Sequence, residues 1–476
     1  MTVTADWSLL AVELTVCGWI LLTLAADLLL SAARKRWLWA LTLSGIAVAA
    51  LLLGMQQHTG LAGSFQSMFV LDRFGLYFKW LFLLTVAVVI VMTRESASLR
   101  SEHAGAFYLL LLTALLGMCT LASINDLLLL FIGLELLTFS LYIMAAYLRT
   151  DAHSVEAGMK YLIMGSVSSG FLVYGIALLY GFAGSTNFHV LHATLASGPA
   201  PLTAQAGMLL VLSGLGFKIA AVPFHLWVPD VYEGAPTPVV ALLSVGSKMA
   251  GVVALLRLLW GVFQPLAWLW TDLLAVLSAA TLLYGNLAAI PQTNIKRLLG
   301  YSSIGHAGYL LMGLSTGSLA GARAVAYYLL AYLFSNLTVF LVVTVATESL
   351  GGEALDDYRG LSKRSGLLAA TMFIGLLSLA GVPPLAGFVG KLLVLLSTVE
   401  THRVWLAALG AVNVAISLYY YLMVVKRMYL DAPRTPAPIP VSALTRAALT
   451  GLVLGILAVG LVQEPFLARI AAAFQP

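Results

Sequence analysis

Long apolar segments follow one another along almost the whole chain of 476 residues. Most are long enough to cross the hydrocarbon core of a bilayer, which takes roughly 20 residues of α-helix. Because a bilayer offers no water to free backbone groups, uninterrupted segments of this kind must form helices there. With 61% hydrophobic and only 9% charged residues, the chain lacks the charged surface of a soluble domain. We therefore predict an all-α polytopic membrane protein.

The apolar segments predict about fourteen transmembrane helices. Basic residues gather in alternate loops, as expected for the cytoplasmic side of a membrane protein. The loops assigned to the inner side contain Arg34, Lys35, Arg36, Arg94, Arg100, Arg149, Lys296, Arg297, Arg359, Lys363, Arg364, Lys426, Arg427 and Arg434. This asymmetry predicts a multi-pass protein of the cytoplasmic membrane with both termini on the outer, periplasmic side.

The sequence disfavours nucleic acid, metal and redox groups as ligands of this chain. The formal charge of +5 is spread over single residues and short clusters, without an aromatic-interleaved basic patch. Cys17 and Cys119 stand alone in apolar segments and lack the CxxC spacing of redox and metal sites. No Walker loop or dinucleotide-binding glycine motif occurs. We expect the energy source to be another chain or an ion gradient.

Two parts of the chain resemble each other and predict an internal repeat. The segment from Glu156 aligns with the segment from Arg323, and FKIAAVP ending at Pro223 aligns with LSLAGVP ending at Pro383. An odd number of predicted helices separates the copies, so we expect the repeats to be inverted in the membrane. The predicted domains are three helices in residues 1–104, five-helix repeats in 105–263 and 264–430, and a last helix in 431–476.

Each predicted repeat contains one membrane helix that is interrupted by proline. Pro223 interrupts LGFKIAAVPFHLWVP, and Pro383 with Pro384 interrupts LLSLAGVPPLAGFVGK. Proline removes a backbone donor and leaves carbonyl groups unpaired, so polar side chains or water are expected nearby. Paired broken helices in inverted repeats are typical of ion sites at mid-membrane.

Several ionisable residues lie within the predicted membrane helices or beside the breaks. They are Glu135, Lys160, Lys218, His225, Lys248, His306 and Lys391. A charge at the bilayer centre costs about 2.5–3.5 kcal/mol on insertion scales, so such residues usually serve ion movement. The structural alternatives are a static ion pair for Glu135, a satisfied core histidine for His225 and a snorkelling side chain for Lys391.

These residues suggest a lateral proton path. We expect Glu135 to pair with Lys218, and its approach or withdrawal to decide whether Lys218 holds a proton. The proton then passes from Lys218 to Lys248 and on to Lys391. Lys160 is expected to bridge the central lysines to Glu135. Another lysine, Lys79, is expected to anchor its helix at the outer interface.

Two long motifs carry a resemblance to a known family. They are GFKIAAVPFHLWVPDVYEGAPTPV, followed by Ser247–Lys248, and QTNIKRLLGYSSIGHAGYLL. Both closely resemble the subunit N (subunit 2) family of proton-pumping NADH:quinone oxidoreductase, or respiratory complex I. The resemblance extends from about the third predicted helix to the thirteenth. It implies an antiporter-like fold with inverted five-helix repeats.

The resemblance also implies a role, partners and site residues. The proton path of the family falls on Glu135, Lys218, Lys248 and Lys391, and Lys160, His225 and His306 fall on its polar positions. The implied partners are antiporter-like paralogues, small membrane subunits, lipid and, indirectly, the peripheral redox arm. The implied cofactors, NADH, FMN, iron–sulfur clusters and quinone, belong to the parent complex and not to this chain. The alternatives are a subunit of a multi-subunit sodium/proton antiporter and a purely structural scaffold, which the buried charges disfavour.

Overall fold

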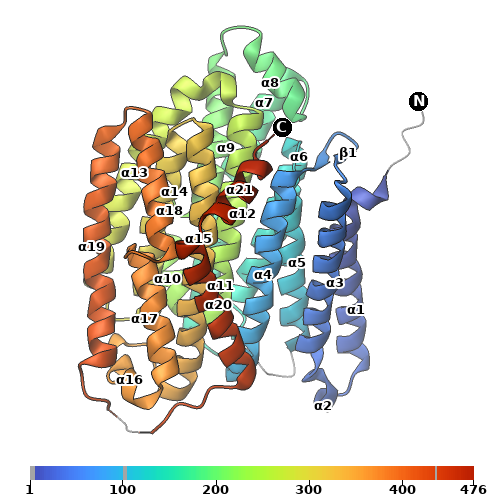
Figure 1. Ribbon diagram of the computed structural model, residues 1–476. Coiled ribbons are helices and arrows are strands. Elements are labelled where there is room, and N and C mark those ends of the chain that lie inside the picture. Colours follow the sequence, from blue (N-terminus) through green and yellow to red (C-terminus); the bar gives the residue numbers. More distant parts are fainter. Residues whose placement is uncertain (1–5, 100–103, 435–436, 476) are drawn as a thin grey trace.

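The computed structural model describes residues 6–99, 104–434 and 437–475, which form a bundle of helices (Figure 1). Among these residues, twelve helices are long and apolar enough to cross a membrane. The strands in the described part of the chain are β1 (Gly63–Phe65) and β2 (Phe69–Leu71), which form a short antiparallel hairpin. The predicted all-helical, multi-pass architecture is confirmed, whereas the total of about fourteen membrane helices stays a prediction.

The N-terminal part is a group of helices that packs on the rest of the bundle through α1, α3 and α4. Its elements are η1 (Trp7–Leu10), α1 (Ala11–Leu29), α2 (Ala32–Lys35), α3 (Leu38–Thr59), α4 (Arg73–Glu95) and η2 (Ala97–Leu99). The carboxylate of Asp72 caps α4 by accepting from the backbone amide of Gly75 at 2.7 Å. Through α4 this group packs against α5, α15 and α20.

Lys79 lies in this group, on α4, and is completely buried. Its Nζ is 2.8 Å from Oε1 of Glu13 on α1, and it stands 4.9 Å from the centroid of the Phe69 ring. The prediction that Lys79 anchors α4 at the interface is wrong. The ammonium turns inward because a carboxylate on another helix is there to pair with it.

The first predicted repeat is built from helices that follow one another in the sequence. They are α5 (Ala104–Ala122), α6 (Leu127–Ala145), α7 (Ala152–Ala183), α8 (Phe188–Ala196), α9 (Leu202–Ile219), α10 (Trp227–Gly234), α11 (Thr237–Leu242), the π-helical turn η3 (Leu243–Ser247) and α12 (Lys248–Gly261). Asp126 and Asp151 cap α6 and α7 with their side chains.

The second predicted repeat and the C-terminal part follow. Their elements are η4 (Gln264–Leu266), α13 (Ala267–Ala289), α14 (Ile295–Ser315), α15 (Leu319–Leu350), η5 (Leu355–Tyr358), α16 (Leu361–Arg364), α17 (Gly366–Ala380), α18 (Ala386–Glu400), α19 (Val404–Tyr429), α20 (Ala443–Leu461) and α21 (Glu464–Ala473). In Figure 1, α20 and α21 cross the front of the bundle, and both contact α15 and α4.

The packing order is similar in the two halves. In the first half α5 packs on α6, and α7 packs on both α9 and α10. In the second half α13 packs on α14, and α15 packs on both α17 and α18. This order agrees with a repeat, while its inversion across the membrane and the division into domains stay predictions.

Both expected helix breaks have a counterpart in the backbone. Pro223 lies in the non-helical segment between α9 and α10, and Pro383 with Pro384 lies between α17 and α18. Each first half-helix ends on a left-handed residue, Ala220 at φ +64° and Gly381 at φ +87°. The chain therefore turns out of the helix at these points, and the last carbonyls of α9 and α17 need other partners.

The basic helices α2 and α16 lie at the same end of the bundle, on its two sides, and α8 lies at the other end (Figure 1). They contain Lys35, Lys363 and Arg364, which the charge asymmetry assigns to inner loops. Another residue of that set, Arg100, lies outside the described residues. The side of the membrane on which the termini lie stays a prediction.

Candidate functional site

Lys218 lies in the last turn of α9 and is buried. Its Nζ donates to Oγ1 of Thr138 on α6 at 2.8 Å and to the hydroxyl of Tyr161 on α7 at 3.3 Å. The Tyr161 ring lies 5.8 Å from the same nitrogen. Three helices thus enclose one amine with hydroxyl groups, which can both accept and donate a proton.

Glu135 is half-buried on α6, one turn before Thr138. Its Oε1 accepts a hydrogen bond of 2.5 Å from Oγ of Ser169 on α7. The ion pairs formed by the described residues do not join Glu135 to Lys218, so the expected direct contact is absent in this conformation. Instead the carboxylate lines a cavity of about 490 Å³ with Ser166 and Ser169. Thr138, which lies on α6 with Glu135, accepts the hydrogen bond from the amine of Lys218.

Lys160 lies in a charged network on α7, α10 and α14. Its Nζ is 2.8 Å from Oε1 of Glu156 and 2.7 Å from Oδ2 of Asp230. Nη1 of Arg297 lies 2.8 Å from both Asp230 and Glu233. The expectation that Lys160 bridges the central lysines to Glu135 is wrong, because these acids hold its partly exposed amine. Asp230 was not among the residues predicted for the site, although it directly follows Pro229 in the motif WVPDVYEG.

His225 lies just beyond the first break and is buried. Its ring meets the Tyr284 ring edge-on, with the centroids 4.3 Å apart. The ring also interacts with the backbone of Pro223 at the break. The role of His225 in a proton path stays a prediction.

Lys248 follows the π-helical turn η3 and is buried. Its Nζ donates to the carbonyl and to Oγ of Ser303 on α14. The ring of Tyr332 on α15 lies 5.6 Å from the nitrogen, and the Tyr332 hydroxyl donates to the same Ser303 Oγ at 3.1 Å. Single π-turns inside α-helices are often found at functional sites, and this one gave no recognisable signal in the sequence.

Lys218 and Lys248 are linked through α12. Gly251 stands three residues after Lys248, and a Cβ atom at this glycine would lie 3.3 Å from Cγ of Lys218. The absence of a side chain there lets the stem of Lys218 lie against the helix that carries Lys248. Lys218 and Lys248, which flank the proline-rich stretch in the sequence, therefore lie on two helices, α9 and α12, that pack against each other.

His306 occupies the space between Lys248 and Lys391. A hydrogen bond of 2.6 Å joins its Nδ1 to the hydroxyl of Tyr328, and another of 3.1 Å joins its Nε2 to that of Tyr421. In a neutral imidazole one nitrogen accepts a hydrogen bond and the other donates one. The bonds to the two tyrosines therefore fix the orientation of the His306 ring. The Tyr332 ring centroid lies 4.9 Å from that of His306.

Lys391 is buried on α18, beside the second break. Its Nζ donates to the carbonyl of Ala380, the last residue of α17, at 2.9 Å. The Tyr309 ring lies 5.0 Å from this nitrogen. Lys391 therefore satisfies a carbonyl that the broken helix leaves free, and it is not the snorkelling side chain of the structural alternative.

Together these groups form a row from Lys218 to Lys391, and polar and ring contacts connect its part from Lys248 to Lys391. Tyr332 touches both Lys248 and His306, and Tyr328 touches His306 and also Tyr309, with ring centroids 6.0 Å apart. Tyrosine hydroxyls can donate and accept in turn, so they can relay protons between basic side chains. The bases in this row were predicted from the sequence, but the tyrosines between them were not. In the sequence, each of these tyrosines is indistinguishable from a core aromatic residue.

The remaining chemistry of the site is limited by the residue types present. Across the described ranges, no group of three or more His, Cys, Asp and Glu side chains is placed to hold a metal ion. The row is therefore one of amines, an imidazole and hydroxyl groups. Such groups exchange protons with one another and with water.

Comparison with known proteins identifies the family. Residues 124–417 match the family described as NADH:quinone oxidoreductase/Mrp antiporter, TM. NADH-quinone oxidoreductase subunit N of Moorella thermoacetica is 43% identical over 432 residues, which cover 90% of this chain and 90% of that protein. The chain belongs to the subunit N family. Subunit N 2 of Roseiflexus castenholzii is 41% identical over 97% of this chain and 95% of its own.

Chains in solved structures have the same fold. A chain of respiratory complex I from Thermus thermophilus with bound aureothin is 33% identical, with a TM-score of 0.83, and the match covers 97% of this chain and 99% of that one. A chain of the Mrp complex from Dietzia is 22% identical with a TM-score of 0.83, and shares the fold. The predicted resemblance to subunit N is confirmed, as is the antiporter-like fold.

Proposed function

We propose that this chain is the proton-translocating subunit N of an NADH:quinone oxidoreductase, and that it couples quinone reduction on other subunits to proton pumping. The observation that supports the proposal most is the row of buried bases and tyrosines from Lys218 to Lys391. Buried amines in a membrane are costly, and these are held by neutral hydroxyl and carbonyl groups instead of carboxylates. Without a fixed counter-ion, each amine can gain and lose a proton as its surroundings change.

The row suggests a sequence of proton transfers. A proton on Lys218 leaves through Thr138 or Tyr161 and moves through water to Lys248. From Lys248 it passes by Ser303 and Tyr332 to His306, and then by Tyr328 and Tyr309 to Lys391. Within this path, Glu135 acts as the switch at the Lys218 end. Lys160 and His225 lie at the edge of the row. Lys160 contacts the Asp230 network, and His225 lies beside the first break.

The same proposal assigns the partners and the location. The chain lies in the cytoplasmic membrane with both termini on the outer side, next to antiporter-like paralogues, small membrane subunits and lipid. The NADH, FMN, iron–sulfur and quinone chemistry takes place on other subunits, and the redox arm contacts this chain only indirectly. The domains are residues 1–104, the two repeats 105–263 and 264–430, and the helix in 431–476.

A substitution at Lys218 tests the function. In vesicles that contain the assembled complex, Lys218→Met should abolish NADH-driven proton translocation, measured with a pH-sensitive dye beside quinone reduction. Lys363→Met, which removes an exposed lysine of α16, is the matched control and should pump normally. Unchanged pumping by Lys218→Met in a fully assembled complex would refute the proposal.

The sodium/proton antiporter alternative is separated by co-purification. A tagged chain that brings down flavin and iron–sulfur subunits supports the oxidoreductase. A tagged chain that brings down only other membrane subunits, together with sodium-dependent proton exchange in vesicles, supports the antiporter.

A further inference from the structure

A groove of about 850 Å³ lies on the surface of the bundle, between α5, α6 and α7. Its walls include Leu110 of α5, Ile143 of α6 and Met159 of α7. Ile143 and Met159 are each more than half exposed, so the groove opens toward the outside of the bundle. We call this feature the lateral groove. Its lining does not include the bases of the row described above.

Small residues form part of the groove. Ala146 and Gly158 both line it, and a Cβ atom at Gly158 would lie 2.3 Å from Cβ of Ala146. The inner ends of α6 and α7 therefore meet through small residues and leave space beside their contact. On the opposite wall, the exposed residue Ala106 of α5 carries only a methyl group.

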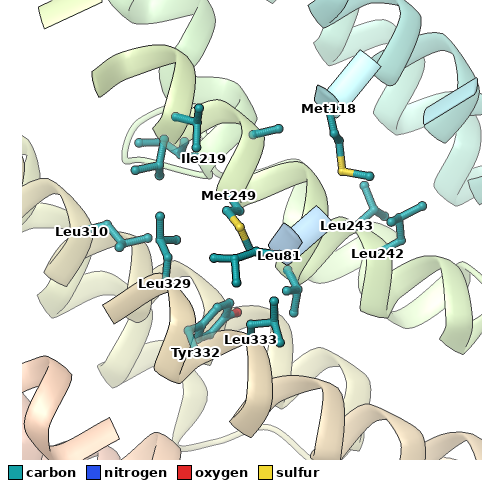
Figure 2. Close-up of a cluster of buried hydrophobic side chains, with 14 of the residues drawn as sticks. Leu81, Met118, Ile219, Leu242, Leu243, Met249, Leu310, Leu329, Tyr332 and Leu333 are labelled. Carbon is teal, nitrogen blue, oxygen red and sulfur yellow. The ribbon is translucent and has the colours of Figure 1, made fainter. Parts of the chain in front are cut away.

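The groove differs from the interior of the bundle, where side chains fill the space between helices. Figure 2 shows Met118 of α5 directed toward Leu242 and Leu243 in the buried core. All three side chains are buried, as expected for a close-packed protein interior. The lateral groove is instead open to its surroundings, so the hydrocarbon of a membrane reaches its walls.

The length of the groove matches one leaflet of a membrane. α7 begins at Ala152, next to the loop that lines one end of the groove, and Leu162 lines the groove ten residues further on. Ten residues of helix rise about 15 Å, which is half of the roughly 30 Å hydrocarbon core of a bilayer. An acyl chain spans this same distance within its own leaflet.

The width of the groove favours an acyl chain over a protein helix. Spread over about 15 Å, the volume of about 850 Å³ gives a mean cross-section of about 57 Å². An α-helix with its side chains is about 10–12 Å wide and so covers roughly 80–110 Å². The groove is therefore too narrow to admit a transmembrane helix of a neighbouring chain.

One end of this apolar groove is polar and basic. Arg149 and Thr150 of the α6–α7 loop line it there, together with Ser98 of η2. Arg149 is exposed and belongs to the basic residues that the charge asymmetry assigns to the inner loops. Basic pockets between membrane helices on this side of a membrane bind the headgroups of anionic lipids.

The acids on neighbouring elements do not neutralise Arg149. Asp151 caps α7 with its side chain, and Asp27 forms an ion pair with Lys35 at 2.9 Å. The carboxylate of Glu348 accepts hydrogen bonds from the segment at the start of η2. The ion pairs formed within the described part of the chain do not include Arg149. Its guanidinium therefore remains available to an anion outside this chain.

We propose that the lateral groove binds one anionic phospholipid, with its phosphate at Arg149 and one acyl chain between α5, α6 and α7. The guanidinium offers two parallel N–H donors to phosphate oxygens, and the hydroxyl groups of Ser98 and Thr150 lie at the same end of the groove. A headgroup with a net negative charge is favoured over a zwitterionic one, which brings an ammonium beside the guanidinium. The site does not depend on the proposed proton path.

Photo-cross-linking in the assembled complex tests the site. The complex is placed in nanodiscs of phosphatidylcholine with a minor fraction of phosphatidylglycerol that carries a diazirine in one acyl chain. Illumination should attach the lipid to peptides of α5, α6 and α7 that line the groove, identified by mass spectrometry. Arg149→Gln should reduce this labelling about fivefold, the effect of one arginine near an anionic lipid surface, and Arg149→Lys should retain most of it.

Two further variants separate the headgroup contact from the acyl-chain contact. Ala106→Trp places an indole in the groove and should reduce its labelling while Arg149 is unchanged. Arg36→Gln removes another exposed arginine of an inner loop, outside the groove lining, and should be labelled like the wild type. Co-purification of the other subunits confirms that each variant is assembled.

Three results would each overturn the proposal. The first is equal labelling of the groove in Arg149→Gln and the wild type, or in Ala106→Trp and the wild type. The second is equal labelling by a phosphatidylcholine that carries the same diazirine. The third is the absence of label from the groove in the assembled complex, as expected if a neighbouring protein chain covers it.

Discussion

The ion pair between Glu13 and Lys79 allows the sharpest test of what holds the N-terminal helices to the bundle. The amine is completely buried, the carboxylate is 7% exposed, and their atoms are 2.8 Å apart. Lys79→Met removes the positive charge, keeps an unbranched side chain, and leaves Glu13 buried without its partner. Breaking a buried pair in this way destabilises a protein by about 3–5 kcal/mol.

The size of the destabilisation depends on which partner of the ion pair is removed and on whether the other partner stays buried and charged. The lost cation–π contact with Phe69, 4.9 Å from Nζ, adds about 0.5–2 kcal/mol to the effect of Lys79→Met. Replacing both partners, as in Glu13→Leu with Lys79→Met, removes the uncompensated charge, and buried pairs replaced by apolar residues are often neutral or stabilising. The double variant should therefore be more stable than the single variant Lys79→Met.

The assay is the heat-induced unfolding of the tagged chain in the detergent-solubilised complex, followed by loss of the soluble chain with temperature. The single variant should unfold at a clearly lower temperature than the wild type, and the double variant should recover most of the difference. If the double variant were as unstable as Lys79→Met alone, the loss would come from packing and not from the unpaired carboxylate. That result would refute the reasoning.

Three further predictions concern other parts of the structure. Tyr421→Phe removes one of the two hydrogen bonds of His306 and should lower proton translocation several-fold while quinone reduction by the assembled complex is retained. Gly381→Ala puts a Cβ at φ +87°, which costs about 1–2 kcal/mol and should lower the unfolding temperature. Burial alone would raise the pKa of Asp72, but the charge and hydrogen bonds of Arg257 hold it below its ordinary value. Its folded pKa is thus depressed, so its stabilising effect is full above about pH 4 and is lost as the pH falls further. The acid sensitivity of unfolding should therefore be smaller in Asp72→Asn.

Each of these predictions has its own control. Tyr419→Phe changes an exposed tyrosine on the same helix as Tyr421 and should pump normally; equal losses would contradict the role of the His306 bond. Gly351→Ala, also at positive φ but with open space around its Cβ, separates backbone strain from crowding. For Asp72, an unchanged pH profile of unfolding in Asp72→Asn would contradict the assignment.

Much of the fold follows directly from the sequence. Apolar segments of membrane length must become helices because the bilayer provides no partners for free backbone groups, and the described residues confirm this. The positions of Pro223 and Pro383 predicted where helices end, since proline cannot donate and its ring blocks the preceding turn. The ionisable residues inside apolar segments marked the site, because such residues are rarely kept there without a function.

The tertiary structure decided which groups those residues meet. Lys160, Lys218 and Lys79 look alike in the sequence, as single lysines in apolar surroundings. The structure pairs Lys79 with Glu13 and Lys160 with Asp230, and surrounds Lys218 with neutral hydroxyl groups. Partners that lie tens or hundreds of residues apart leave no local pattern, so sequence periodicity cannot distinguish a paired lysine from an unpaired one.

The sequence alone determined that the chain is a membrane protein with two interrupted helices and a set of buried bases, because hydropathy, proline and charge act locally. Only the tertiary structure decided that tyrosines connect those bases. Such contacts depend on the rotation and register of helices packed side by side. That register is set by the whole core, and no single segment of the chain records it.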